Sequence, residues 1–99
     1  MTKSDRIRFE WDNRKSGQNR RKHGYDFKFF VLVFYDPLRR TEIEGDEHGE
    51  IRWQTIGEID GRIFVVSHTI REEDNIEIYR IISARRATPS ERRFYAEAP

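Results

Sequence analysis

Three arginines beside a predicted helix start are the residues in this chain best suited to chemistry. Arg80, Arg85 and Arg86 end a β-rich stretch, and Thr88-Pro89-Ser90-Glu91 follows at once. Thr-x-x-Glu is the pattern of a capping box and proline favours the first helical position, so a helix is predicted to begin at Pro89. Guanidinium groups stay charged and offer a planar fork of donors, which suits phosphate or carboxylate. This strand-to-helix junction is the first candidate for a functional site.

Each of these residues also has a structural alternative. Arg80 could pair with a carboxylate instead of contacting phosphate, since buried arginines are usually paired; the candidate partners are Glu58, Glu77 and Glu91. Arg86 is expected to face solvent. Tyr95 falls one helical turn after Glu91 and could stack on a base, donate a proton or anchor the C-terminal helix in the core.

The three histidines allow acid–base chemistry but indicate no metal site. His68 lies near the end of a predicted strand, on the same face as Phe64 and Val66. Because imidazole titrates near neutral pH, His68 is either a general acid or base, a phosphate contact, or a core histidine bonded to a backbone carbonyl. His23 either contacts RNA or closes a helix C-terminus, where a cation is favoured. The histidines, which include His48 in a polar loop, lack metal-ligand spacing, and there is no cysteine.

Charge is distributed unevenly along the 99 residues, although the formal net charge is only +1. Basic residues gather at 14–22 and 80–93 with acidic residues between them, which favours a basic face on the folded protein. A helix before His23 would carry a polar face at helical spacing, open to RNA, a ribosome, an acidic partner or solvent. That face consists of Arg14, Lys15, Gln18, Arg21 and Lys22.

Composition indicates one folded domain over residues 1–99. Charged residues make up 37% and aromatic residues 13%, and a disordered chain would normally lack that aromatic content. No apolar run approaches the ~18 residues that span a membrane. Residues 1–8 lack the apolar stretch of a signal peptide, so the cytoplasm is the expected location. Residues 1–6 are expected to form a frayed tail.

The remaining pattern predicts an α+β domain. A short strand at 7–11, a helix at 13–23 and an apolar run at 27–35 precede four β segments and the C-terminal helix 89–97. The β segments are 41–44, 51–59, 62–70 and 76–83, with loops up to Gly49 and at 71–75, and Asp60-Gly61 as a hairpin turn. We expect a twisted, mainly antiparallel sheet with two N-terminal helices on one face and the C-terminal helix at its edge.

Several motifs, in their order and spacing, resemble the BrnT toxins over residues 9–95. They are Phe9-Glu10-Trp11-Asp12, Asn19, Lys22-His23-Gly24, Val33-Phe34, Asp36-Pro37, Gly49-Glu50-x-Arg52, Ile56-Gly57, His68-Thr69-x-Arg71, Arg80-Ile81-Ile82-Ser83-Ala84-Arg85-x-Ala87, Glu91 and Tyr95. The resemblance implies a RelE-like ribonuclease toxin of a type II toxin–antitoxin pair. It also implies a cognate antitoxin that neutralises the toxin and binds operator DNA within a hetero-oligomer. It favours a helix at 26–35, where composition alone fits strand or helix.

A ribonuclease of this kind makes the RNA 2′-hydroxyl attack its own phosphate, with no metal or other cofactor. The protein must take up the hydroxyl proton, stabilise the phosphorane and protonate the leaving 5′-oxygen. The catalytic candidates are His68, Arg80, Arg85 and Tyr95, and the RNA-binding candidates are Lys22, His23, Arg71 and Arg86. The main alternative is a non-catalytic module that holds RNA or a protein on the same basic face. A structural subunit that has lost toxicity is another.

The apolar run at 27–35 predicts a surface for the antitoxin. Lys28 lies within this run, so part of the run must reach solvent. We expect a hydrophobic groove near 26–35, extended by the basic helix 13–23, that an amphipathic antitoxin helix fills.

Overall fold

The computed structural model of the protein describes residues 6–97. In chain order its elements are β1 (Ile7–Glu10), α1 (Asn13–His23), α2 (Phe27–Phe30), the 3-10 helix η1 (Val31–Tyr35), β2 (Arg40–Glu47), β3 (Glu50–Ile59), β4 (Arg62–Glu73), β5 (Ile76–Arg86) and α3 (Pro89–Ala96). Most of the predicted tail, residues 1–5, lies outside the described residues. Arg6 is described, and its carbonyl accepts a hydrogen bond from the amide of Glu77.

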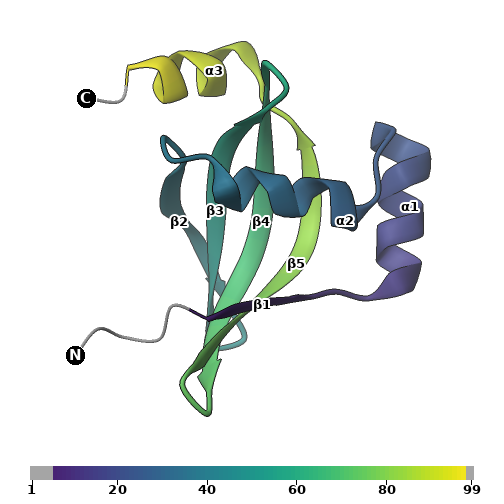
Figure 1. The fold of residues 1–99 in the computed structure, drawn as a ribbon, viewed down its shortest axis with the longest axis vertical. Helices are drawn as coiled ribbons and strands as arrows, with labels where there is room; N and C mark the ends of the chain where they lie inside the picture. The colour runs from purple at the N-terminus through teal and green to yellow at the C-terminus, as the bar shows by residue number, and fades with distance from the viewer. Residues whose placement is uncertain (1–5, 98–99) are drawn as a thin grey trace.

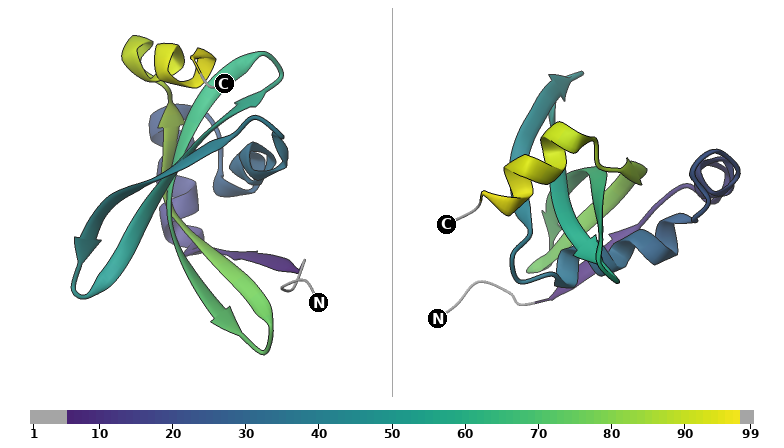
Figure 2. Two further views of the ribbon diagram at one scale, coloured as in Figure 1. Left: turned by 90° about the vertical axis from the view of Figure 1, so that its left-hand side faces the viewer. Right: turned by 90° about the horizontal axis from the view of Figure 1, so that it is seen from above.

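The strands form a single five-stranded sheet in the order β1-β5-β4-β3-β2 (Figure 1). β1 runs parallel to β5, and the other neighbours are antiparallel. Figure 2 shows that the sheet is strongly twisted, so that the tips of the β2–β3 and β4–β5 hairpins point apart. The prediction of an α+β domain with a twisted, mainly antiparallel sheet is confirmed.

Three two-residue turns join the antiparallel strands: His48-Gly49, Asp60-Gly61 and Asp74-Asn75. All six turn residues have φ between 51° and 80°, as a hairpin turn of type I′ requires. The Asp60-Gly61 turn is therefore confirmed. The loops predicted up to Gly49 and at 71–75 are shorter than expected, because charged residues continue the strands to Glu47 and Glu73. Charged side chains are tolerated at these positions because both faces of the twisted hairpin tip are exposed to solvent.

The ambiguous run at 26–35 is helical, in two parts. Asp26 caps α2 by accepting a hydrogen bond from the amide of Phe29 (3.2 Å), and the chain then tightens into η1. Phe30, Val33 and Phe34 are buried against the sheet, in a cluster that also contains Phe64 and Val66. The bulky side chains that suggested a strand are thus accommodated by a short helix that lies across one sheet face (Figure 1).

α1 lies beside the β5 edge of the sheet instead of on the face that α2 covers (Figure 1). Because α1 is almost entirely polar, hydrogen bonds hold it in place. The hydroxyl of Ser16 accepts from the amide of Phe27 (2.9 Å), and the buried Asn19 side chain bonds Tyr25 and Ala84. The Asn19 oxygen accepts from the amide of Ala84, which lies on β5 beyond the four residues that pair with β1. α1 is thus attached to the sheet by a hydrogen bond to the edge of β5 and not by a hydrophobic contact.

A second, smaller core lies on the other sheet face, under α3. Ile56, Val65 and Ala87 are buried there, with Phe94 and Tyr95 packed against them. α2 and α3 therefore lie on opposite sides of the sheet (Figure 2), and α3 covers one end of a face instead of an edge. The predicted capping box is present, because the Thr88 hydroxyl and the Glu91 carboxylate each accept a hydrogen bond from the other residue's amide.

Gly57 on β3 allows η1 to approach the sheet closely, which leads to the first prediction. A Cβ at Gly57 would stand 2.9 Å from both the Cγ1 and the carbonyl oxygen of Val33. Gly57→Ala is expected to push η1 away and to lower the free energy of unfolding by about 1–3 kcal/mol, the usual cost of overpacking. Urea unfolding measures this loss. Gly45→Ala, at a strand position with no atom within 4 Å of a new Cβ, is the control. Equal losses in both variants would contradict the close approach.

Candidate active site

The sheet face opposite α2, which we call the open face, carries three of the candidate residues, Arg71, Arg80 and Arg85. Side chains alternate along β4, so burial of Phe64 and Val66 under α2 directs Ser67, Thr69 and Arg71 to the other side. On β5, Arg85 pairs with Val65, Ser83 with Ser67 and Arg80 with Thr69, so these three side chains share that face. A β-bulge between Ser67 and His68 inserts Ile82 into β5 and preserves this arrangement.

Arg85 forms a bidentate pair with Glu91 at the base of α3. Its Nη1 and Nη2 donate to Oε1 and Oε2 of Glu91 at 2.8 and 2.9 Å. The guanidinium lowers the pKa of Glu91 to about 2, and the carboxylate in turn raises the pKa of Arg85. The Arg85 side chain keeps 40% of its surface exposed. The arginine is thus both held in position and accessible from the open face.

A second carboxylate, Glu44, also acts on Arg85. Its negative charge contributes to raising the pKa of Arg85, after the larger effects of Glu91. The Ser67 hydroxyl donates to Oε1 of Glu44 at 2.7 Å, which brings this β2 side chain across the open face. Glu44 lies at a register shift between Ile43 and Gly45, and bulges of this kind redirect a side chain. Ser67, Glu44, Arg85 and Glu91 therefore form one polar group.

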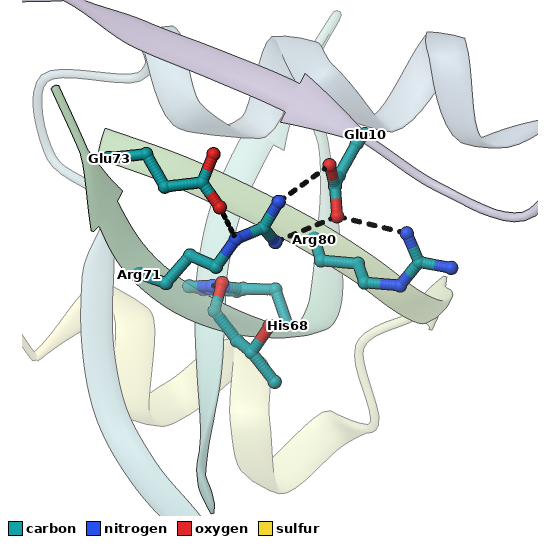
Figure 3. A network of polar contacts seen from close by, with 6 residues as sticks. Glu10, His68, Arg71, Glu73 and Arg80 are labelled. Carbon is teal, nitrogen blue, oxygen red and sulfur yellow. Dashed lines mark hydrogen bonds and ion pairs between the residues drawn. The ribbon is translucent and has the colours of Figure 1, made fainter. Parts of the chain in front are cut away.

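The other arginines of the open face belong to a separate network (Figure 3). Arg71 donates to both oxygens of Glu10 at 2.8 and 3.1 Å, and its Nε donates to Glu73 at 2.7 Å. Arg80 donates to the same Glu10 at 2.9 Å. Hydrogen bonds from Arg71 and Arg80 lower the pKa of Glu10 to about 2. Arg80 is thus paired with Glu10 and not with Glu58, Glu77 or Glu91, the carboxylates expected from the sequence.

The structure does not bring Arg80 and Arg85 into one cluster. They are five positions apart on β5, roughly 16 Å along an extended strand, and each has its own carboxylate partner. Both arginines form ion pairs in this structure, and their binding of phosphate stays a prediction. Both side chains nevertheless stay 40% or more exposed. Each guanidinium therefore remains accessible from solvent.

His68 is completely buried under η1, with a relative exposure of 0%. Its ring stacks on Tyr79 at 5.3 Å and meets the edge of Phe34 at 5.0 Å. Nδ1 lies 3.4 Å from the carbonyl of Thr69, which can only accept, so Nε2 accepts from the Thr55 hydroxyl at 2.7 Å. Burial lowers the pKa of His68 to about 4. This position matches the alternative of a core histidine, because RNA cannot reach the ring in this conformation.

Tyr95 is tied to Asp36, at the end of η1. Its hydroxyl donates to Oδ2 of Asp36 at 2.5 Å, and burial together with this carboxylate raises the pKa of Tyr95. The amides of Leu38 and Glu58 donate to the same Asp36 carboxylate. Asp36 therefore joins η1, β3 and α3. The Tyr95 hydroxyl bonds Asp36 and its ring packs against the smaller core, a position that favours a role in docking α3.

The remaining RNA-binding candidates lie outside these two networks. Lys22 and His23 border a hollow of about 250 Å³ between α1 and β5, whereas Arg86 is exposed at the end of β5. Within residues 6–97 no group of three or more His, Asp or Glu side chains is arranged to hold a metal ion. No helix of this described part is long and apolar enough to cross a membrane.

Comparison with protein families places this chain among known toxins. A family model described as "ribonuclease toxin, BrnT, of type II toxin–antitoxin system" matches residues 11–91. The chain belongs to the BrnT family. This confirms the resemblance drawn from the motifs, and BrnT membership makes the protein a ribonuclease toxin with RNA as substrate and an antitoxin protein as partner. Among curated proteins no match was found.

Within this BrnT fold, the site residues missed by sequence reasoning are the carboxylates Glu10, Asp36 and Glu44. A weak signal for Glu10 was available, because alternation in β1 points it away from Phe9, which packs in the main core. No signal pointed to Glu44, since its direction depends on a bulge. Asp36 stood only within the Asp36-Pro37 motif, and nothing local indicated its contact with Tyr95.

Proposed function

We propose that this BrnT-family toxin is a RelE-like, metal-independent endoribonuclease of the cytoplasm that cuts RNA by attack of the 2′-hydroxyl. The observation that carries the proposal is an accessible guanidinium, Arg85, fixed on the open sheet face by two hydrogen bonds to Glu91, with the charge of Glu44 also acting on it. In the reaction a bond forms between the 2′-oxygen and phosphorus, and the bond from phosphorus to the 5′-oxygen breaks. The products are a 2′,3′-cyclic phosphate and a 5′-hydroxyl.

Arg85 is proposed to stabilise the phosphorane, because a fixed donor fork suits an oxygen that gains charge in the transition state. Glu91 keeps the guanidinium in place through two hydrogen bonds. Arg80, about five strand positions away, is proposed to bind another phosphate of the same RNA strand, with Arg71 beside it. In both places the RNA phosphate adds to an existing carboxylate pair or displaces it.

Glu44 is proposed to accept the proton of the 2′-hydroxyl. A carboxylate with a pKa near 2 is a poor base at neutral pH, which disfavours Glu91. Glu44 lies on the same part of the open face and already accepts a hydrogen bond from the hydroxyl of Ser67. His68 and Tyr95 then contribute by holding η1 and α3 against the sheet.

Product analysis tests the proposed reaction. Purified protein is incubated with a short RNA in EDTA, and the ends of the fragments are identified by mass spectrometry. We expect cyclic phosphate and 5′-hydroxyl ends, with cleavage unaffected by the chelator. If the protein shifts RNA in a salt-dependent manner but never cuts it, the alternative of a non-catalytic binding module is supported instead.

An exposed apolar surface on η1 and β1 is the proposed docking surface for the antitoxin. Leu32, Tyr35 and Leu38 are 49%, 71% and 63% exposed, and Ile7 is 42% exposed. Ile7 and Tyr35 also border a hollow of about 160 Å³ floored by Phe9 and Phe34. An amphipathic antitoxin helix is proposed to cover this surface and so to neutralise the toxin, in a hetero-oligomer that binds operator DNA through the antitoxin.

The second prediction concerns the strength and salt dependence of antitoxin binding. An interface of more than ~1,000 Å² with an apolar centre should be stable, and its affinity should change little with salt. Titration calorimetry at low and high salt measures this. Leu32→Ser combined with Tyr35→Ser should weaken binding at least tenfold, while Ile51→Ser, an exposed apolar residue on β3, serves as the control. Binding that disappears in high salt would mean that charge alone holds the antitoxin.

A further inference from the structure

We infer that the hollow between α1 and β5 is a binding subsite for a backbone phosphate of single-stranded RNA, next to the proposed cleavage site. The inference rests on the proposed function and adds a place where a second part of the substrate is held. The hollow measures about 250 Å³ and is bordered by Lys15, Gln18, Lys22 and His23 of α1 and by Ile82 and Ser83 of β5.

The lining of the hollow has the chemistry of an anion site. Two lysines one above the other, at positions 15 and 22 of one helix stripe, supply ammonium donors. Gln18 and Ser83 add neutral hydrogen-bond donors, and none of the lining residues is acidic. A phosphate placed there meets positive charge and donors without an opposing carboxylate.

Lys15 and Lys22 of α1 differ from three arginines of the sheet in their ion pairing within the described residues. On the sheet, Arg71, Arg80 and Arg85 are each paired with a glutamate. Neither lysine of the hollow forms an ion pair with any carboxylate of residues 6–97. The two lysines of the hollow therefore present positive charge that no ion pair offsets, whereas the charges of Arg71, Arg80 and Arg85 are each offset by a glutamate.

The position of the hollow relates it to the cleavage site. Ser83 borders the hollow and lies on β5 between Arg80 and Arg85. Ser83 and Arg85 are two positions apart on β5, roughly 7 Å along an extended strand, which is on the scale of the step between phosphates in a single strand. An RNA strand with its scissile phosphate at Arg85 can thus place a neighbouring phosphate in the hollow. This continuity favours RNA over an acidic protein segment as the occupant.

The surrounding structure keeps the hollow fixed. Asn19 and Phe27 form its floor, and both are buried. Asn19 bonds the amide of Ala84 at 3.3 Å and the carbonyl of Tyr25 at 3.2 Å, which fixes α1 against β5. The hollow needs no rearrangement to accept a phosphate.

Direct binding of uncleavable RNA tests the inference. The double variant Lys15→Gln, Lys22→Gln is compared with Arg14→Gln, Arg21→Gln, which removes the same charge at the same seven-residue spacing but outside the hollow. Binding of a 2′-O-methyl oligonucleotide is followed by fluorescence anisotropy over a range of salt concentrations. The lysine variant should bind at least tenfold more weakly, with a salt slope smaller by about 0.7 for a lost phosphate contact. The arginine variant should lose less than threefold.

A neutral linkage locates the phosphate. One uncharged methylphosphonate is placed at one position after another along the oligonucleotide. When the neutral linkage lies in the hollow, the wild type also lacks the charged contact that the lysine variant has lost. The two proteins should then bind that oligonucleotide equally well. Equal losses in the two double variants would show general attraction only and would overturn the inference. A lysine variant that loses antitoxin binding but keeps RNA binding would also overturn it. If the wild-type protein neither binds nor cuts RNA, the proposed function itself is wrong. If the lysine variant cuts RNA as well as the wild type, only the proposed subsite is wrong.

Discussion

Replacing Arg85 with alanine is expected to slow RNA cleavage about 100-fold, the usual effect of removing one donor from a developing oxyanion. The pair with Glu91 is partly exposed, so its loss should lower the free energy of unfolding by about 1 kcal/mol or less. The Glu91 carboxylate can still accept from the Thr88 amide and so keep α3 capped. Single-turnover cleavage and thermal melting measure the two effects separately.

Three further variants make the Arg85 prediction specific. Arg85→Lys should recover little activity, because an ammonium lacks the planar fork. Arg80→Ala should lower cleavage about tenfold at low RNA concentration, as expected for one charged hydrogen bond to a phosphate outside the reacting group. Arg93→Ala, on the exposed side of α3, should cleave normally. An Arg85→Ala protein that melts early and is inactive only for that reason would support a purely structural pair.

Acidification from pH 7 to pH 5 is expected to lower the free energy of unfolding by about 2 kcal/mol because of His68. The folded state holds this imidazole neutral, with a pKa of about 4 against 6.5 when unfolded. Between these values the unfolded chain binds more protons, so stability is present above pH 6.5 and is lost as the pH falls towards 4. Glu10 and Glu91, with pKa values of about 2, add their losses only below about pH 4.5.

Urea unfolding of the wild type and of His68→Gln at both pH values checks this prediction. Glutamine can still bond the Thr55 hydroxyl but does not titrate, so the variant should show a much smaller change with pH. If His68→Gln does not fold, NMR titration of the wild-type imidazole gives the same information, with an expected pKa near 4. An imidazole that titrates near 6.5 would show that His68 reaches solvent and would restore it as a catalytic candidate.

The sequence by itself determined the features that depend on neighbouring residues. The capping box at Thr88 and the Asp60-Gly61 turn both involve atoms a few residues apart. Their geometry follows from local chemistry, and the structure confirms each of them. The resemblance to the BrnT motifs also predicted that residues 26–35 are helical, which composition alone did not decide. The fold class followed from these elements together.

Only the tertiary structure decided how the site residues are paired. Arg80 meets Glu10 across 70 residues, and Tyr95 meets Asp36 across 59. The first contact requires β1 to lie parallel to β5 and the second requires α3 to fold back over β3, and neither leaves a local pattern. The burial of His68 depends on η1 lying over β4, while the direction of Glu44 depends on a bulge. Charge partners and exposure arise from packing between distant segments, so residue type and spacing could name the candidates but could not give their roles.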